Sequence, residues 1–309
     1  FEFCILSAVI LFLFLNSRSS ISDSIFPDDY STEILDSNNR ILRIFLNRKE
    51  QWHLIPDSKI DIPDKLEQSV ITFEDKRFFS HNGVDGIAIL RAIISNIINR
   101  RYISGASTIT MQTARLSANR KRTLYSKVIE SLQAFKIEKK FDKKKILKLY
   151  LNHAPYGGNI IGYRTACLRY WGKYPDELTW AEAATLAVLP NNPSMINPVR
   201  KNDLLKNKRD RLLKTLLDRG YIDEENYELS LLEEVPHGQI PFDLSAPHLC
   251  RDLNSRYQGK QVKTTIDKNL QDKITDIVQR YSLLQQKIGI NNAAALVIET
   301  KSGKVRAYV

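Results

Sequence analysis

The twelve residues from Glu74 to Asp85 constrain this chain more than any other part of its sequence. They read Glu-Asp-Lys-Arg-Phe-Phe-Ser-His-Asn-Gly-Val-Asp and bring carboxylates, aromatic rings, a histidine and a glycine together. An amphipathic stretch precedes them, and its apolar residues have helical spacing: Leu66, Val70, Ile71 and Phe73. Glu74 therefore falls at the edge of an apolar helix face, where partial loss of solvent makes a carboxylate a better proton acceptor. Taken alone, the segment fits a helix end with solvated charges better than it fits a catalytic site.

Four further motifs follow this first one in a fixed order. Motif two is Gly-Ala-Ser-Thr-Ile-Thr-Met-Gln at 105–112, followed by Arg115. Motif three is Lys-Val-Ile-Glu at 127–130, motif four runs over 143–152, and motif five runs over 162–173. In this order and at these separations, the five motifs resemble the peptidoglycan glycosyltransferase domain (glycosyltransferase family 51) of class A penicillin-binding proteins. The run Thr-Met-Gln in motif two and the run at 151–158 resemble the C type of that class.

The resemblance implies a mainly α, lysozyme-like domain that extends glycan chains. The donor would be a glycan on undecaprenyl pyrophosphate and the acceptor the 4-hydroxyl of lipid II, with inversion at the anomeric carbon and loss of the pyrophosphate. Such a reaction needs a base for the hydroxyl and positive charge for the leaving group. Glu74 matches the family's catalytic glutamate, and Glu130 matches its second glutamate.

The remaining site residues follow from the same match. Lys127 and Arg115 are candidate ligands of the pyrophosphate, although Lys127 and Glu130 also fit an ordinary surface ion pair three residues apart on a helix. The polar residues of motif two are candidate substrate contacts, although Ser and Thr there also fit helix capping: Ser107, Thr108 and Gln112. Three residues of motif one are counted with the binding site but are expected mainly to hold Glu74 in place: Asp75, Phe78 and His81.

Four positions depart from the family pattern, and neither glutamate is among them. Alanine replaces a glycine, methionine a glutamine, serine an arginine and lysine a glutamate, at Ala106, Met111, Ser126 and Lys148. These departures bear on how strongly the site holds substrate more than on whether it reacts.

The net charge of +11 is concentrated near motifs two to four. Residues 115–148 contain twelve Lys or Arg and three Asp or Glu, a local net charge of +9. Such a stretch indicates an anionic partner or a solvated helix face, and the resemblance assigns it to the pyrophosphate. No aromatic-interleaved basic motif is present, so no nucleic-acid partner is expected. The histidines lack metal-ligand spacing and the three cysteines are expected to be free and packed, so no cofactor is required, with a divalent cation at the pyrophosphate left open.

The organisation expected along the chain has five parts. Residues 1–16 are expected to be part of a transmembrane signal-anchor, with a cleavable signal peptide as the rival, and 17–60 a linker with a β hairpin. The glycosyltransferase domain is expected over 61–235 and a connector over 236–262. Residues 263–309 are expected to begin an α/β transpeptidase domain and leave it incomplete. No serine has a lysine three residues after it, so neither transpeptidase activity nor penicillin acylation is expected.

The expected function is therefore lipid II polymerisation at the bacterial inner (cytoplasmic) membrane by a single-pass protein with its catalytic part on the periplasmic or outer side. Expected partners are lipid II, the growing glycan strand, moenomycin-type inhibitors and cell-wall synthesis proteins. Two alternatives remain open. One is a truncated, non-enzymatic scaffold that binds lipid II, and the other is a lytic murein enzyme on a lysozyme-like fold.

Overall fold

The computed structural model describes residues 25–57, 61–99, 106–118, 123–191 and 202–309. The chain forms two compact units. Unit one contains residues 58–238 together with the described residues 25–27, and unit two contains residues 28–57 and 239–309. The finer five-part division expected from the sequence stays a prediction.

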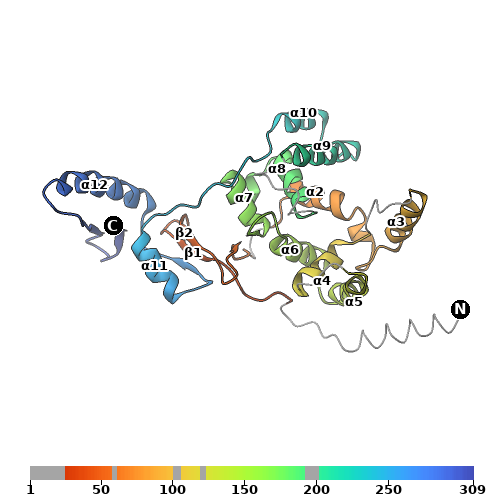
Figure 1. The fold of residues 1–309 in the computed structure, drawn as a ribbon, viewed down its shortest axis with the longest axis horizontal. Helices are drawn as coiled ribbons and strands as arrows, with labels where there is room; N and C mark the ends of the chain where they lie inside the picture. The colour runs from red at the N-terminus through yellow and green to blue at the C-terminus, as the bar shows by residue number, and fades with distance from the viewer. Residues whose placement is uncertain (1–24, 58–60, 100–105, 119–122, 192–201) are drawn as a thin grey trace. The chain divides into compact units, whose positions relative to one another are not determined.

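Unit one is built from helices (Figure 1). Its α-helices are α2 (Asp64–Glu74), α3 (Gly86–Ile98), α4 (Ile109–Ala118), α5 (Leu124–Lys140), α6 (Lys143–His153), α7 (Tyr163–Trp171), α8 (Trp180–Val188), α9 (Asn202–Asp218) and α10 (Glu224–Leu232). Short 3-10 helices cover Phe78–Ser80, Pro175–Glu177 and Leu189–Asn191, and β4 is the two-residue strand Ile160–Ile161.

Two groups of helices form the interior of unit one. In the first, α2 packs against α8 and α9. Small buried side chains on α8, Ala183, Ala184 and Ala187 among them, allow close helix packing, and α2 contributes the larger buried Leu66 and Val70. In the second group, α4 packs against both α5 and α6 (Figure 1). The first group carries motif one, and the second carries motifs two, three and four.

Side chains at several helix starts accept hydrogen bonds from the first helical turn, which satisfies backbone donors that the helix itself leaves unpaired. These N-caps are Asp85 for α3, Thr123 for α5, Asp142 for α6, Thr179 for α8 and Asp223 for α10. Asp85 caps α3 by accepting from the Ala88 amide at 2.8 Å.

Unit two combines segments from both ends of the chain. The strands β1 (Thr32–Leu35) and β2 (Ile41–Phe45) are antiparallel, and β1 also pairs in parallel with β5 (Gln261–Lys263). The other elements are β3 (Trp52–His53), α11 (Pro247–Arg256), α12 (Lys268–Gln286) and the antiparallel pair β6 (Leu296–Ile298) and β7 (Val305–Tyr308). Ile34 lies opposite Val262 in the parallel pair, so residues 228 positions apart share one sheet.

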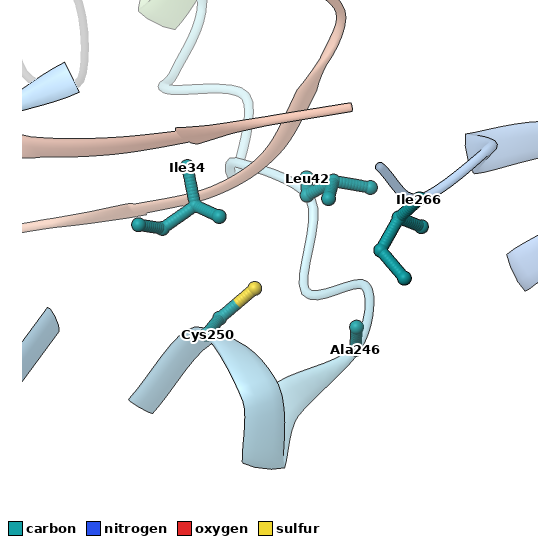
Figure 2. Packing of buried hydrophobic residues seen from close by; sticks show 5 residues of the cluster. All are labelled: Ile34, Leu42, Ala246, Cys250 and Ile266. Carbon is teal, nitrogen blue, oxygen red and sulfur yellow. The ribbon is translucent and has the colours of Figure 1, made fainter. Parts of the chain in front are cut away.

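The core of unit two lies between this sheet and α11. Figure 2 shows its buried residues, which come from two strands, from α11 and its start, and from the turn after β5: Ile34, Leu42, Ala246, Cys250 and Ile266. Burial raises the pKa of the Cys250 thiol to about 11, so it is an inert packing group at neutral pH. Cys167 in unit one is likewise free and buried, as the sequence predicted for both residues.

The mainly α fold class is confirmed, and so is the hairpin that precedes unit one in sequence. Asn39, in the turn between β1 and β2, has a φ of 65°, a left-handed conformation that asparagine tolerates well. The carboxylate of Asp36 accepts from the amides of Asn38 and Arg40 and closes the turn.

The expected single-pass location in the bacterial inner membrane requires correction. Among the residues that the structure describes, no helix combines the length and the apolar character needed to cross a bilayer. The segment 1–16, on which the expectation rested, lies outside the described residues.

Candidate active site

Glu74 is the last residue of α2, and a glutamine from motif two holds its carboxylate. The apolar face of α2 is buried as the sequence predicted, which leaves Glu74 half-buried at the edge of that face. Gln112 of α4 is 8% exposed, and its Nε2 donates to Oε2 of Glu74 at 2.7 Å. The predicted base and a predicted substrate contact, 38 residues apart in sequence, therefore touch directly.

The Glu74 carboxylate interacts electrostatically with aromatic and basic side chains, Tyr150 and Lys208 among them. Burial, followed by the negative charge of Glu74, raises the pKa of the Tyr150 hydroxyl well above its ordinary value, while Arg115 acts in the opposite direction. Burial also lowers the pKa of Lys208 on α9, and Glu74 partly offsets that effect. Lys208 therefore interacts with the Glu74 charge directly, and Arg115 acts on the same tyrosine as Glu74 does.

Glu130 lies on α5, in the interior of unit one. Its exposed fraction is 1%, which disfavours a solvated surface ion pair with Lys127 as the explanation of motif three. Lys127, one turn earlier on the same helix, is partly exposed. The buried Glu130 carboxylate and the accessible Lys127 ammonium are one turn apart on α5. This arrangement fits a site in which both groups interact with one charged substrate.

Asp75 and His81 form a buried pair beside Glu74. Nε2 of His81 lies 3.0 Å from Oδ1 and 3.1 Å from Oδ2 of Asp75, and Oδ2 of Asp75 also accepts from the amide of Ile109 at 3.1 Å. Ile109 begins α4, so the carboxylate sits at the positive end of that helix. Phe78 is fully buried and packs edge-on against Phe79. The expectation that Asp75, Phe78 and His81 hold Glu74 in place stays a prediction, and these contacts within motif one are compatible with it.

The polar residues of motif two divide into two kinds. Thr108 is 2% exposed, and its hydroxyl donates to the Gly83 carbonyl at 2.6 Å and accepts from the Met111 amide at 3.1 Å. Thr108 therefore caps α4 and ties it to motif one. Ser107, its neighbour, is partly exposed and remains the better candidate for a substrate contact. Gly105, the first residue of the motif, lies outside the described residues.

The structure also reveals residues around the candidate site that the sequence did not single out. Lys143 of motif four donates from Nζ to the His81 carbonyl at 2.6 Å and to Oε1 of Glu138 at 2.7 Å, and it lies over the ring of Phe78. The Thr110 hydroxyl donates to the same Glu138 oxygen at 2.6 Å. Lys143 sits in a recognisable motif, whereas the role of Glu138 appears only when α4, α5 and α6 are brought together.

Two of the four residues that depart from the family pattern, Met111 and Ser126, make contacts that explain their positions. Met111 is buried, and its sulfur lies 4.0 Å from the Ser131 hydroxyl of α5, so this residue packs α4 against α5. Ser126 is buried at the start of α5, where the Thr123 hydroxyl donates to its Oγ at 2.9 Å. Ala106 and Lys148 are both partly exposed.

A metal centre does not emerge from the described part of the chain. There, no group of three or more His, Cys, Asp or Glu side chains is arranged to hold an ion. The lysines of the basic stretch 115–148 differ in their surroundings. Lys139 and Lys140 are exposed at the end of α5, whereas Lys143 makes the contacts with His81, Glu138 and Phe78 described above.

The chain resembles known proteins over most of its described length. A family model described as Transglycosylase matches residues 38–217. Penicillin-binding protein 1A of Aquifex aeolicus (strain VF5) is 43% identical over 199 residues, which cover 64% of this chain and 27% of that protein. Penicillin-binding protein 1C of Escherichia coli (strain K12) is 31% identical over 250 residues, which cover 81% of this chain and 32% of that protein.

A crystal structure of penicillin-binding protein 1A from Haemophilus influenzae matches with a TM-score of 0.40 and 19% identity, over 89% of this chain and 32% of that one. The chain thus spans about a third of the length of these relatives or slightly less. Because the relatives include both 1A and 1C proteins, the finer assignment to the C type stays a prediction. The family model covers more than half of the chain, which confirms the resemblance seen in the motifs: this protein belongs to the transglycosylase family.

Proposed function

We propose that this chain is a peptidoglycan glycosyltransferase that polymerises lipid II into glycan strands, with inversion at the anomeric carbon and release of undecaprenyl pyrophosphate. Family membership supports the reaction class. The observation that carries the assignment of residues is the hydrogen bond from Gln112 to Glu74, because it joins the two motifs that supply a base and a substrate contact.

Glu74 acts as the base. Its carboxylate accepts the proton of the acceptor 4-hydroxyl while the hydroxyl oxygen forms a bond to the anomeric carbon of the donor. The bond from that carbon to the pyrophosphate oxygen breaks on the opposite face, and the electron pair leaves with the pyrophosphate. The hydrogen bond to Oε2 fixes the plane of the carboxylate, so that the base is oriented before the substrate arrives.

Glu130 stabilises positive charge that develops at the anomeric centre. Inverting sugar chemistry uses two carboxylates on opposite sides of the reacting bond. Burial of Glu130 strengthens its interaction with a developing charge, because a low-dielectric environment screens it less than water does.

Lys127 and Arg115 stabilise the departing pyrophosphate. Both are partly exposed and can reach a bound anion, and Arg115 shares the surroundings of Tyr150 with Glu74. A cation beside the leaving group lowers the barrier only as negative charge accumulates there, which is the requirement for catalysis rather than simple binding. The same positive charges are the proposed contact for moenomycin-type phosphoglycolipids.

The two alternatives predict different products. A lytic enzyme would shorten existing strands and has no pyrophosphate to neutralise, so it gives no reason for the basic residues near Glu74. A scaffold would bind lipid II without turnover, and it gives no reason for orienting the Glu74 carboxylate through Gln112.

The test is a polymerisation assay with fluorescent lipid II in detergent. The wild-type chain and Glu67→Gln are expected to form polymer, because Glu67 lies on the same helix two turns before Glu74. Glu74→Gln keeps the size and removes the base, so its turnover is expected to fall at least about 100-fold. Full polymerisation by a folded Glu74→Gln chain contradicts the assignment.

A further inference from the structure

Gly83 lies where motif one meets the helix that carries Glu130. Its φ is +93°, a conformation that residues with a side chain rarely adopt. A Cβ at this position would lie 2.9 Å from both the carbonyl carbon and the oxygen of Ala134, and 3.1 Å from Cγ of Glu138. Ala134 and Glu138 belong to α5, so the backbone of motif one approaches that helix as closely as a glycine allows.

The contact lies one turn from the second catalytic carboxylate. Ala134 follows Glu130 by four residues, so the two lie on the same face of α5. Motif one begins with Glu74 and reaches Gly83 through a short 3-10 helix and the His81–Asp75 pair. The spacing between Gly83 and α5 is therefore part of the path that separates the two glutamates.

Hydrogen bonds leave this junction little freedom to adjust. The Gly83 carbonyl accepts from Thr108, which caps the helix that carries Gln112. The Glu138 carboxylate beside Gly83 is held by Lys143 and Thr110, and Lys143 also binds the His81 carbonyl. A group inserted at position 83 meets backbone on one side and a carboxylate held by two donors on the other.

We propose that Gly83 is a positioning residue, a role that rests on the proposed function. Because Gly83 has no side chain, motif one can approach α5 closely, and this approach sets the separation of Glu74 and Glu130. Ordinary Cβ contacts begin at 3.4 Å, so relief of a 2.9 Å contact requires a shift of at least about half an ångström between motif one and α5. A misplacement of about 1 Å in a catalytic constellation can lower turnover by about 100-fold. Binding through flexible cations is less sensitive to such a shift.

The test compares Gly83→Ala with Gly220→Ala in the full 309-residue chain. Gly220 has a φ of +71° and nothing within 4 Å of its added Cβ, so this control has the backbone strain without the collision. Gly83→Ala is expected to lower kcat for lipid II by about 10–100-fold with KM changed less than about threefold. Gly220→Ala is expected to keep both values.

A second pair of variants tests the junction without the collision. Thr108→Val removes the hydroxyl that donates to the Gly83 carbonyl, and Thr108→Ser keeps it. The valine variant is expected to lower kcat by about 10-fold and the serine variant to restore it. If Gly83→Ala does not fold, the two Thr108 variants test the positioning role of the Gly83 junction in its place.

Amide hydrogen exchange gives a readout that needs no turnover. Peptides from α5 are expected to exchange faster in Gly83→Ala than in the wild type, and unchanged in Gly220→Ala. A Gly83→Ala chain that keeps the wild-type kcat, or a Thr108→Val chain that does so, overturns the positioning role while the proposed function stands. A wild-type chain that forms no polymer contradicts the proposed function, and the positioning role falls with it.

Discussion

Gln112 donates a hydrogen bond from Nε2 to Oε2 of Glu74 at 2.7 Å, and this contact links the end of α2 to the first turn of α4. Gln112→Met keeps the length of the side chain and removes the donor. The unoriented carboxylate is expected to lower kcat for lipid II by about 10–100-fold, with little change in KM. Steady-state kinetics of the purified variant checks this, and an unchanged kcat would show that the hydrogen bond does not orient the base.

The N-cap of α3 makes the stability of unit one depend on pH. Arg77 donates from Nε to Oδ2 of Asp85 at 2.9 Å, and this interaction, aided by the Ala88 amide, lowers the pKa of Asp85 to about 2. A carboxylate whose pKa is depressed in the folded state contributes stability above its unfolded value, and this contribution is lost as pH falls toward the folded value.

Asp85→Asn is therefore expected to lower the free energy of unfolding by about 1–2 kcal/mol at pH 7, and by progressively less below pH 4. Urea unfolding of the wild type and the variant between pH 7 and pH 3 measures the difference. Asp223→Asn is the control, because asparagine caps α10 as well as aspartate does and its effect should be small. A difference for Asp85→Asn that does not shrink at low pH would be inconsistent with the ion pair.

The Lys143–Glu138 pair is expected to stabilise the contact between α5 and α6. Lys143→Met leaves the largely buried Glu138 carboxylate without its cation and should lower the free energy of unfolding by about 2–3 kcal/mol. Lys145→Met, at an exposed position on the same helix, should change it by less than about 0.5 kcal/mol. The double variant Lys143→Met with Glu138→Gln should recover part of the loss, and equal losses in the single and double variants would argue against a coupled pair.

Lys127 and Arg115 are expected to serve the leaving group. Lys127→Ala and Arg115→Ala should each lower kcat/KM for lipid II by about 10-fold or more and weaken moenomycin binding. Lys139→Ala, which removes an exposed charge from the same helix as Lys127, is the control and should behave as the wild type. Unchanged turnover and unchanged moenomycin affinity in both site variants would identify these residues as surface charges.

Much of the helical architecture could be predicted from local patterns. The apolar spacing behind Pro63 predicted α2, and Asp85, Asp142 and Thr179 are side chains of the type that begin helices. Helix α4 was not predicted, because its residues are buried on several sides and show no single apolar face. Helix α11 was assigned to a connector, although Leu249, Cys250 and Leu253 carry a short helical pattern.

The candidate site was predictable as a set of residues but not as a set of contacts. Motifs identified Glu74 and Gln112 separately, and nothing in the sequence shows that one donates to the other. Gly83 matched a family position, but the reason for a glycine there is the backbone of Ala134, which lies 51 residues later. Such contacts depend on how helices pack, and a local pattern carries no information about packing between distant segments.

The stoichiometry of the reaction with lipid II tests most directly whether this chain polymerises lipid II with Glu74 as the base. Glycosidic bonds formed and undecaprenyl pyrophosphate released are measured together for the wild type and for Glu74→Gln. We expect the wild type to release one undecaprenyl pyrophosphate for each new bond, with an inverted anomeric configuration, and Glu74→Gln to give at least about 100-fold less of both products. Binding of lipid II by the folded wild type without release of pyrophosphate, or release without a new glycosidic bond, would contradict this expectation.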